Sequence, residues 1–342
     1  MSSRKKFNLA VVGATGAVGE TMLAILAERH FPIANFYPLA SAQSAGSPVV
    51  FANRSYLVED TDSFDFSQVD IALFSAGGAV SKAVAPKAAK AGCIVIDNTS
   101  EFRYADDVPL VVPEVNPLAI GEYTKRNIIA NPNCSTIQMV VALKPIYDAV
   151  GITRINVATY QSVSGAGRAG IKELAGQTAA LLNGHNAEIN VFNSQIAFNV
   201  IPQIDCFQEN GYTREEMKMV WETQKIFDDP SLMVNPTAVR VPVFYGHSEA
   251  VHIETREKLT AGQAREMLNA AAGVTVLDSP ADLCYPTAVK QGAAKDSVYV
   301  GRIREDISHD HGLNLWIVAD NVRKGAALNA VQIAEQLIEH YL

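Results

Sequence analysis

The sequence predicts a mixed α/β fold in two parts: a first part built on a parallel sheet, and an α+β second part with an open, mostly antiparallel sheet. Three observations support this prediction. Strand-like and helix-like stretches alternate through the first third of the chain, and the strand-like stretches are apolar throughout, as in a sheet covered on both faces. The length of 342 residues also exceeds one ordinary domain and fits two.

The first part contains short apolar runs, which we interpret as buried strands, each followed by a turn or a helix-like stretch. The expected strands are Leu9–Val12, Asn35–Ala40, Ile71–Phe74 and Ile94–Asp97, and the expected helices are Glu20–Arg29 and Val80–Ala91. The pattern changes around Asn131–Cys134, where the second part begins. Its expected strands are Thr153–Tyr160, Val239–Phe244, Glu249–Thr255, Val298–Arg304 and Leu313–Ala319, and its expected helices are Ile137–Val150, Ala169–Leu182 and Arg214–Phe227.

The last helix-like stretch, Ala326–Tyr341, has apolar residues near one face and suits packing against the first part. We therefore expect one domain from residues 1–133 together with 320–342, and a second domain from residues 134–319. No internal repeat or low-complexity tract divides the chain further.

Composition excludes several classes of function. The formal net charge of -8 argues against a general role on nucleic acid or at a membrane surface. No apolar run approaches the ~18 residues that span a bilayer, and the N-terminus lacks the apolar stretch of a signal peptide. We therefore expect a cytoplasmic protein. The four cysteines are widely spaced without a CxxC pair, so neither a metal site nor a disulfide framework is predicted.

A Gly-rich turn between the first strand and the first helix predicts a dinucleotide site. Gly13, Gly16 and Gly19 are spaced GxxGxxG, a variant of the GxGxxG fingerprint. Such a turn lets backbone N–H groups approach a pyrophosphate at a helix N-terminus. The alternative is a plain tight connection, but the place at the start of a Rossmann-like α/β half favours the cofactor. The expected contacts are Gly13, Thr15, Gly16, Ala17 and Val18.

The segment after the second strand indicates which dinucleotide is bound. It reads Ala40-Ser41-Ala42-Gln43-Ser44-Ala45-Gly46 and lacks the carboxylate that holds an adenosine ribose in NAD enzymes. A 2′-phosphate could be accepted there by Ser41, Gln43 and Ser44, which favours NADP. Ser75, Ala76 and Gly77 follow the third strand and should also face the cofactor, although a plain turn is an equal alternative.

The hexapeptide Asn131-Pro132-Asn133-Cys134-Ser135-Thr136 points to a nucleophile. Pro132 and Asn133 favour a turn before an apolar helix, which places Cys134 near a helix N-terminus. There the helix dipole and free N–H groups lower a thiol pKa and favour the thiolate. The other cysteines, Cys93, Cys206 and Cys284, are expected to be small buried apolar residues.

A thiolate that attacks an acyl group needs an acid/base partner, and histidine is the usual choice near neutral pH. Of the seven histidines, His247 lies beyond an expected strand, after Gly246, and His252 lies inside the next strand. One of the two should be structural. Spacing alone does not decide whether His247 and Arg240 converge, because Pro242 and Gly246 interrupt the strand period.

These motifs together resemble the bacterial aspartate-β-semialdehyde dehydrogenases over essentially the whole chain. The resemblance rests on Val12–Gly19, Asn131–Thr136, Gln161–Gly167, Glu215–Lys218 and Arg240–Glu249. It implies reversible reduction of L-aspartyl-4-phosphate to aspartate 4-semialdehyde with NADPH and release of phosphate, on the path to lysine, threonine and methionine. It also implies a dinucleotide-binding domain, a catalytic and dimerisation domain, and a homodimer formed through the latter.

The resemblance assigns roles to single residues. Cys134 would form the acyl-enzyme thioester, His247 would be the general acid/base, and Gln161 would position the intermediate. Substrate contacts would come from Arg240 to the α-carboxylate, Glu215 to the amino group, and Lys218 and Arg103 to phosphate. Ser164, Gly165 and Asn321 would lie at the cofactor. Without the resemblance, Glu215 and Lys218 read more simply as an i,i+3 pair on a solvated helix face.

One position departs from the pattern, and other activities compete. Many relatives carry arginine where this chain has Gln43, so we expect a preference for NADP that is weaker than in those relatives. An N-acetyl-γ-glutamyl-phosphate reductase uses the same chemistry, but Glu215 suits a free ammonium. Glyceraldehyde-3-phosphate dehydrogenases differ around the Gly turn and Cys134. A silent paralogue acting as a binding protein should have lost Cys134 or His247, and both are present.

Overall fold

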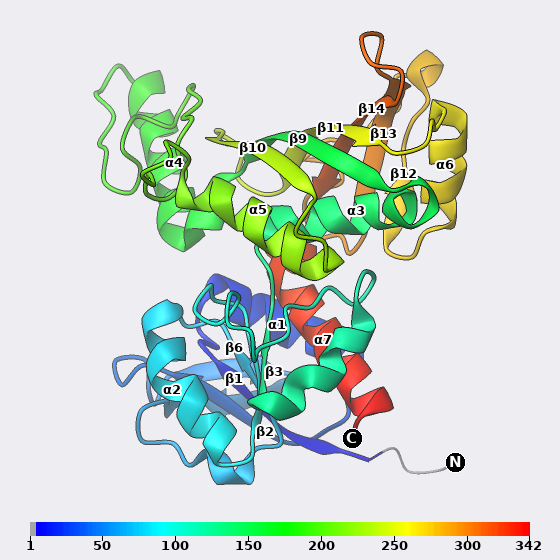
Figure 1. Cartoon of the computed structure of the whole chain (residues 1–342). Coiled ribbons are helices and arrows are strands. Elements are labelled where there is room, and N and C mark those ends of the chain that lie inside the picture. The colour runs from blue at the N-terminus through cyan, green and yellow to red at the C-terminus, as the bar shows by residue number, and fades with distance from the viewer. Residues whose placement is uncertain (1–4) are drawn as a thin grey trace. The chain divides into compact units, whose positions relative to one another are not determined.

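The computed structural model describes residues 5–342, which form two compact units, residues 5–133 with 326–342 and residues 134–325. The first unit contains a six-stranded parallel sheet in the order β5-β2-β1-β6-β7-β8 (Figure 1). Its elements are β1 Phe7–Val12, α1 Ala17–Glu28, β2 Ile33–Ala40, β3 Pro48–Phe51, β4 Arg54–Leu57, β5 Glu59–Asp60, β6 Ile71–Phe74, α2 Gly78–Lys90, β7 Ile94–Asp97, β8 Ile128–Ala130 and α7 Leu328–His340.

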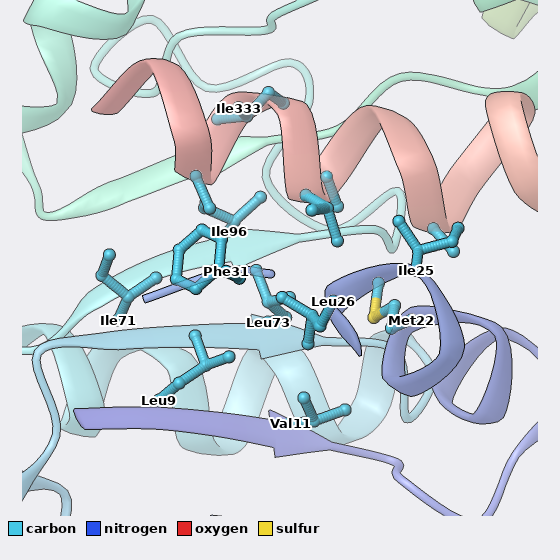
Figure 2. Close-up of a cluster of buried hydrophobic side chains, with 14 of the residues drawn as sticks. Leu9, Val11, Met22, Ile25, Leu26, Phe31, Ile71, Leu73, Ile96 and Ile333 are labelled. Atoms are coloured by element: carbon cyan, nitrogen blue, oxygen red, sulfur yellow. The ribbon is translucent and has the colours of Figure 1, made fainter. Parts of the chain in front are cut away.

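The strand residues are apolar on both faces because helices cover both. Leu9, Ile71 and Ile96 point to one face, where α1 and α7 close the core with Met22, Ile25 and Ile333 (Figure 2). Asp97 points to the other face, where it accepts a hydrogen bond from Ser81 of α2. This arrangement confirms the predicted Rossmann-like half. The hairpin β3–β4 and the edge strand β8 were not predicted.

The second unit contains a six-stranded mixed sheet in the order β10-β9-β11-β14-β13-β12. Pairing is antiparallel for the three central pairs and parallel only at the edges, β10 with β9 and β12 with β13. The elements are α3 Cys134–Val150, β9 Ile152–Gln161, α4 Gly167–Leu182, α5 Arg214–Phe227, β10 Met233–Arg240, β11 His247–Thr255, α6 Ala261–Ala270, β12 Val274–Val276, β13 Val298–Glu305 and β14 Gly312–Ala319. The predicted open and mostly antiparallel sheet is confirmed.

One predicted strand in this unit was wrong. The apolar stretch Val239–Phe244 was expected to be a strand, but β10 ends at Arg240. The segment after it turns away, and Gly246 adopts a φ of 86° that favours glycine. Helix α6 was not predicted. Within residues 5–342, no helix is long and apolar enough to cross a membrane.

The helix-covered face of this sheet holds a buried carboxyl. Glu249 of β11 and Gln138 of α3 are both fully buried, and neither makes a hydrogen bond of ordinary geometry with a residue that the structure describes. Burial raises the pKa of the Glu249 carboxyl well above its ordinary range, although Gln138 lowers it in part. Burial therefore favours the protonated form of this carboxyl.

Candidate active site

Three of the expected site residues meet at one edge of the second sheet. Parallel pairing of β9 and β10 places Gln161 directly beside Arg240, at the carboxyl ends of both strands. His247 is the first residue of the next strand in space, β11. The pairing of the strands thus brings Gln161 and His247 together although they are 86 positions apart in the sequence. It also shows that Arg240 and His247 converge, which the spacing alone left open.

His247 is fully buried and its ring is held by the loop after β9. The Ser162 N–H donates to Nδ1 at 3.1 Å, so a neutral ring carries its hydrogen on Nε2. Burial, and then the charge of Arg240, lower the pKa of His247 to about 3. Nε2 makes no hydrogen bond to any described residue. The hydrogen bond to Nδ1 thus fixes the ring of His247, and Nε2 is left to interact with a substrate.

His252 takes the structural role. It points to the opposite face of β11 from His247, where its Nε2 lies 2.7 Å from the Asp306 carboxylate. Of the two histidines that the sequence left open, only His247 lies beside Arg240.

Arg240 is buried, and its guanidinium lies close to the backbone of Gly165. Its Nη1 donates to the Ser162 carbonyl at 2.7 Å, and burial lowers its pKa while Glu215 and Cys134 raise it. A Cβ added at Gly165 would lie 2.8 Å from Arg240 Nη1 and 3.4 Å from His247 Nε2. Glycine at position 165 therefore keeps open the space into which both groups face.

Helix α5 places the carboxylate of Glu215 and the ammonium of Lys218 beside Gln161, at the same edge of the second sheet. The helix begins after Thr213, which forms a reciprocal capping box with Glu216. Glu215 accepts a hydrogen bond from Gln161 Nε2 at 3.3 Å and forms an ion pair with Lys218 Nζ at 3.0 Å. The alternative of a solvated i,i+3 pair is wrong, because the Glu215 and Lys218 side chains are only 6% and 13% exposed.

Cys134 is the first residue of α3 and is partly exposed. A Cβ added at Gly325 would lie 2.7 Å from Cys134 Cβ, so the backbone of a single π-helical turn, Arg323–Ala327, packs directly on the cysteine. Such turns occur often at functional sites. Of the other cysteines, Cys93 is buried as expected, but Cys206 is exposed and Cys284 is partly exposed, so the expectation for these two was wrong.

The side chain of Asn321 links the loop after β9 to Gly246, the residue before His247. Its Oδ1 accepts from the Ser162 and Ser164 hydroxyls at 3.1 Å each and from the Gly246 N–H at 3.0 Å. The side chains of Ser164 and Asn321 are thus engaged in holding the His247 loop. Any contact of theirs with a cofactor would add to this role.

The Gly-rich turn of the first unit is tight at two glycines. Gly13 has a φ of 88°, and a Cβ there would lie 2.9 Å from the Ser75 backbone. At Gly19 a Cβ would lie 2.1 Å from the Gly13 carbonyl. Only glycine fits this packing, which brings the backbone of the turn to the start of α1. Gly16 caps that helix, with Thr15, Ala17 and Val18 around the helix start.

Two further segments lie at the carboxyl ends of neighbouring strands. Ser75, Ala76 and Gly77 follow β6 and lead into α2, and the Ser75 N–H donates to the Val12 carbonyl. The turn that holds Ser41, Gln43 and Ser44 follows β2, and the Gln43 side chain is exposed. Since β2, β1 and β6 are adjacent, all three turns share one sheet edge, which fits a dinucleotide.

Arg103 lies in the first unit and is held by main-chain carbonyls. Nε donates to the Asn131 carbonyl at 2.8 Å and Nη2 to the Asn98 carbonyl at 2.7 Å. It is 6% exposed. Its role at phosphate stays a prediction.

Sequence reasoning missed two residues at this site. Asp205 lies in the segment between α4 and α5, and its Oδ2 is 2.9 Å from Lys218 Nζ. Ser162, through its amide, its hydroxyl and its carbonyl, contacts His247, Asn321 and Arg240. Ser162 lies inside a motif that the sequence singled out. Nothing in the sequence marks Asp205, since its role depends on how a loop folds back on α5.

Comparisons with known proteins cover nearly the whole chain. Two family models match: "Semialdehyde dehydrogenase, NAD binding domain" over residues 8–123, and "Semialdehyde dehydrogenase, dimerisation domain" over residues 143–324. An aspartate-semialdehyde dehydrogenase from Legionella pneumophila is 65% identical over 99% of this chain and 97% of its own length. Aspartate-semialdehyde dehydrogenase 2 from Vibrio cholerae is 66% identical over 98% and 99%.

Solved structures are similar in fold as well. Aspartate semialdehyde dehydrogenase II from Vibrio cholerae, complexed with ASA, has a TM-score of 0.97 at 64% identity and covers 99% of this chain and 100% of its own. The aspartate semialdehyde dehydrogenase with NADP from Candida albicans has a TM-score of 0.76 at 25% identity, covering 97% and 98%. With both family models matched in order and two thirds of its residues shared with such relatives, this chain belongs to the semialdehyde dehydrogenase family.

Proposed function

We propose that this protein is an aspartate-semialdehyde dehydrogenase that reversibly reduces L-aspartyl-4-phosphate to L-aspartate 4-semialdehyde with NADPH and releases phosphate. The observation that carries the proposal is the buried edge where His247 Nε2 and the Arg240 guanidinium face one space beside the Glu215 carboxylate. A fixed cation and a fixed anion side by side match the α-carboxylate and α-ammonium of an amino acid.

Cys134 would carry the acyl group. Its thiolate attacks the acyl carbon of the aspartyl phosphate, the carbon–oxygen bond to phosphate breaks, and phosphate leaves with the electron pair. The product is a thioester on Cys134. NADPH, when bound, supplies the hydride that reduces this thioester to the aldehyde, and the thiolate is released again.

His247 would act as the general acid/base and donate a hydrogen bond to the acyl oxygen. Because the Ser162 amide occupies Nδ1, the ring offers Nε2–H as a donor. Negative charge develops on the acyl oxygen at each tetrahedral stage, and a fixed donor in a buried site stabilises it. Gln161, held between Thr159 and Glu215, would position the same intermediate.

The residues of the first unit fit the cofactor. The glycine-only packing of Gly13 and Gly19 leaves backbone N–H groups at the start of α1, where pyrophosphate binds. We assign dinucleotide binding to this unit, and catalysis and dimerisation to the unit that begins at Cys134. Asp320 and Asn321, which the sequence placed with the first domain, are bonded to Ala294, Ser162 and Gly246 of the second.

The enzyme works as a homodimer through its second unit. Helices α3, α5 and α6 contact one face of the mixed sheet. On the other face the rings of Tyr160 and Trp316 lie with their centroids 5.5 Å apart and their planes tilted by 45°, and Tyr160 is 38% exposed. This aromatic face is a suitable contact for a second copy. We place the enzyme in the cytoplasm, where reducing conditions keep its four cysteines as free thiols.

Reduction of NADP by aspartate semialdehyde, dependent on added phosphate, tests the function. We expect turnover with the semialdehyde and none with N-acetylglutamate semialdehyde, whose amine is blocked and leaves Glu215 without a partner. Turnover of the acetylated substrate alone would assign the chain to N-acetyl-γ-glutamyl-phosphate reductase instead.

Replacing Gln43 with arginine is expected to widen the preference for NADP over NAD. The turn after β2 carries neither a carboxylate that repels a 2′-phosphate nor an arginine that binds it. Neutral contacts contribute about 1 kcal/mol each, and a charged one about 1.5–3 kcal/mol. The ratio of kcat/KM values for NADP and NAD should rise roughly tenfold or more.

The comparison uses parent and Gln43→Arg enzyme at one ionic strength. An unchanged ratio would mean that position 43 points away from the phosphate. A parent that prefers NAD would overturn the assignment of NADP.

A further inference from the structure

The Lys218 ammonium is shared by two carboxylates. Nζ lies 2.9 Å from Asp205 Oδ2 and 3.0 Å from Glu215 Oε2, with the lysine side chain 13% exposed. Burial lowers the pKa of Lys218, but Glu215 and Asp205 more than offset it and raise the value. Lys218 is therefore a fixed cation whose charge is already neutralised before any anion arrives.

The two carboxylates differ in how they are held. Glu215 lies in the first turn of a capped helix, and its other oxygen accepts from Gln161. Asp205 lies in the segment between α4 and α5, and its side chain is 34% exposed. Its second oxygen accepts from the Cys206 N–H at 2.8 Å. One carboxylate belongs to the rigid substrate edge, and the other reaches Lys218 from a surface segment.

Asp205 also borders open space beside the substrate edge. A cavity of about 170 Å³ is lined by Asp205, Arg240, Phe192 and Ile201, among others. The charges of Lys218 and Arg240 are thus balanced by those of Glu215 and Asp205. A phosphate dianion that approaches Lys218 therefore meets no net positive charge, because the carboxylates of Glu215 and Asp205 already offset the two cations.

We propose that Asp205 sets the affinity for phosphate by competing with it for the Lys218 ammonium. The proposal rests on the proposed function, in which Lys218 contacts phosphate, as the resemblance to the family implies, and Glu215 stays anionic to hold the substrate amine. Asp205 is then the carboxylate that phosphate displaces. It weakens phosphate binding and speeds its release after the thioester forms, and it acts through Lys218 without touching the aspartyl moiety.

The test is Asp205→Asn, measured in the direction of semialdehyde oxidation. Asp205 has a φ of 68°, a conformation that asparagine adopts more readily than alanine, and the amide oxygen can still accept from the Cys206 N–H. With the competing charge removed, the KM for phosphate should fall about five- to tenfold, while the KM for the semialdehyde stays within about twofold. Calorimetric titration with inorganic phosphate should give a Kd that falls in parallel.

Asp228→Asn is the matched control. Asp228 is exposed, has a φ of 52° and caps α5 at its other end, so it loses the same charge on the same kind of backbone. Both KM values should stay at the parent level. An unchanged or higher Kd for phosphate in Asp205→Asn would overturn the proposal and make Asp205 a support for Lys218. Since calorimetry needs no turnover, this result is independent of whether the parent oxidises the semialdehyde.

Discussion

Replacing Cys134 with alanine is expected to lower phosphate-dependent turnover by roughly 10⁴-fold or more, as loss of a covalent nucleophile does elsewhere. Alanine removes only the sulfur from a residue whose Cβ packs on Gly325, so the fold should be retained. Steady-state reduction of NADP measures the loss, and circular dichroism checks the fold. Residual activity within about tenfold of the parent would exclude the thioester route.

The reactivity of the same thiol offers a second measurement. Cys134 begins α3 and is partly exposed, where the helix N-terminus favours a thiolate. Iodoacetamide should label it near pH 7 well before Cys206, which is exposed but lies on no helix, and before Cys93, whose pKa burial raises. Mass spectrometry of the labelled peptides identifies the order. Equal rates for Cys134 and Cys206 would contradict the argument for activation.

Replacing Arg240 with lysine is expected to cost roughly 2–4 kcal/mol of transition-state binding, about 30- to 1000-fold in kcat/KM. Lysine keeps the charge but loses the planar fork that grips a carboxylate at two points. It also loses the bond from Nη1 to the Ser162 carbonyl, which sits next to the His247 support. The loss should appear with aspartate semialdehyde as a rise in KM together with a fall in kcat.

Arg154→Lys provides the control, because Arg154 is an exposed residue of the neighbouring strand β9 and should tolerate the change. A substrate analogue that lacks the α-carboxylate should be turned over equally poorly by parent and Arg240→Lys enzyme. If Arg240→Lys retains near-normal kcat/KM, Arg240 is structural and the α-carboxylate binds elsewhere.

The sequence predicted correctly those elements in which the capping residues and the pattern of apolar residues match the side chains that are buried in the structure. Helix α5 begins and ends where expected, because Thr213 and Glu216 form a capping box before an amphipathic run. Strand β10 was misplaced by the opposite situation. Its true residues include Pro236 and exposed polar side chains, as an edge strand permits, whereas the more apolar stretch that follows is a turn.

The site was predictable where one motif holds several of its residues. Cys134 at a helix start and the glycines at a tight turn follow from local chemistry. The bond between Ser162 and His247 depends on the antiparallel register of β9 and β11. The approach of Gly325 to Cys134 spans 191 positions. Contacts of this range are set by tertiary packing, which no local pattern encodes.

The raised pKa of the buried Glu249 carboxyl has a consequence for the heat of unfolding. Since the folded-state pKa of Glu249 lies above its unfolded value, the stability that this group contributes is fully present below the unfolded pKa of about 4.3 and is lost as pH rises through the folded value. Between the two values, each molecule that unfolds gives up a proton from the Glu249 side chain. The buffer takes up that proton, so its own enthalpy of ionisation becomes part of the calorimetric signal, and Glu249 makes the apparent unfolding enthalpy depend on the choice of buffer.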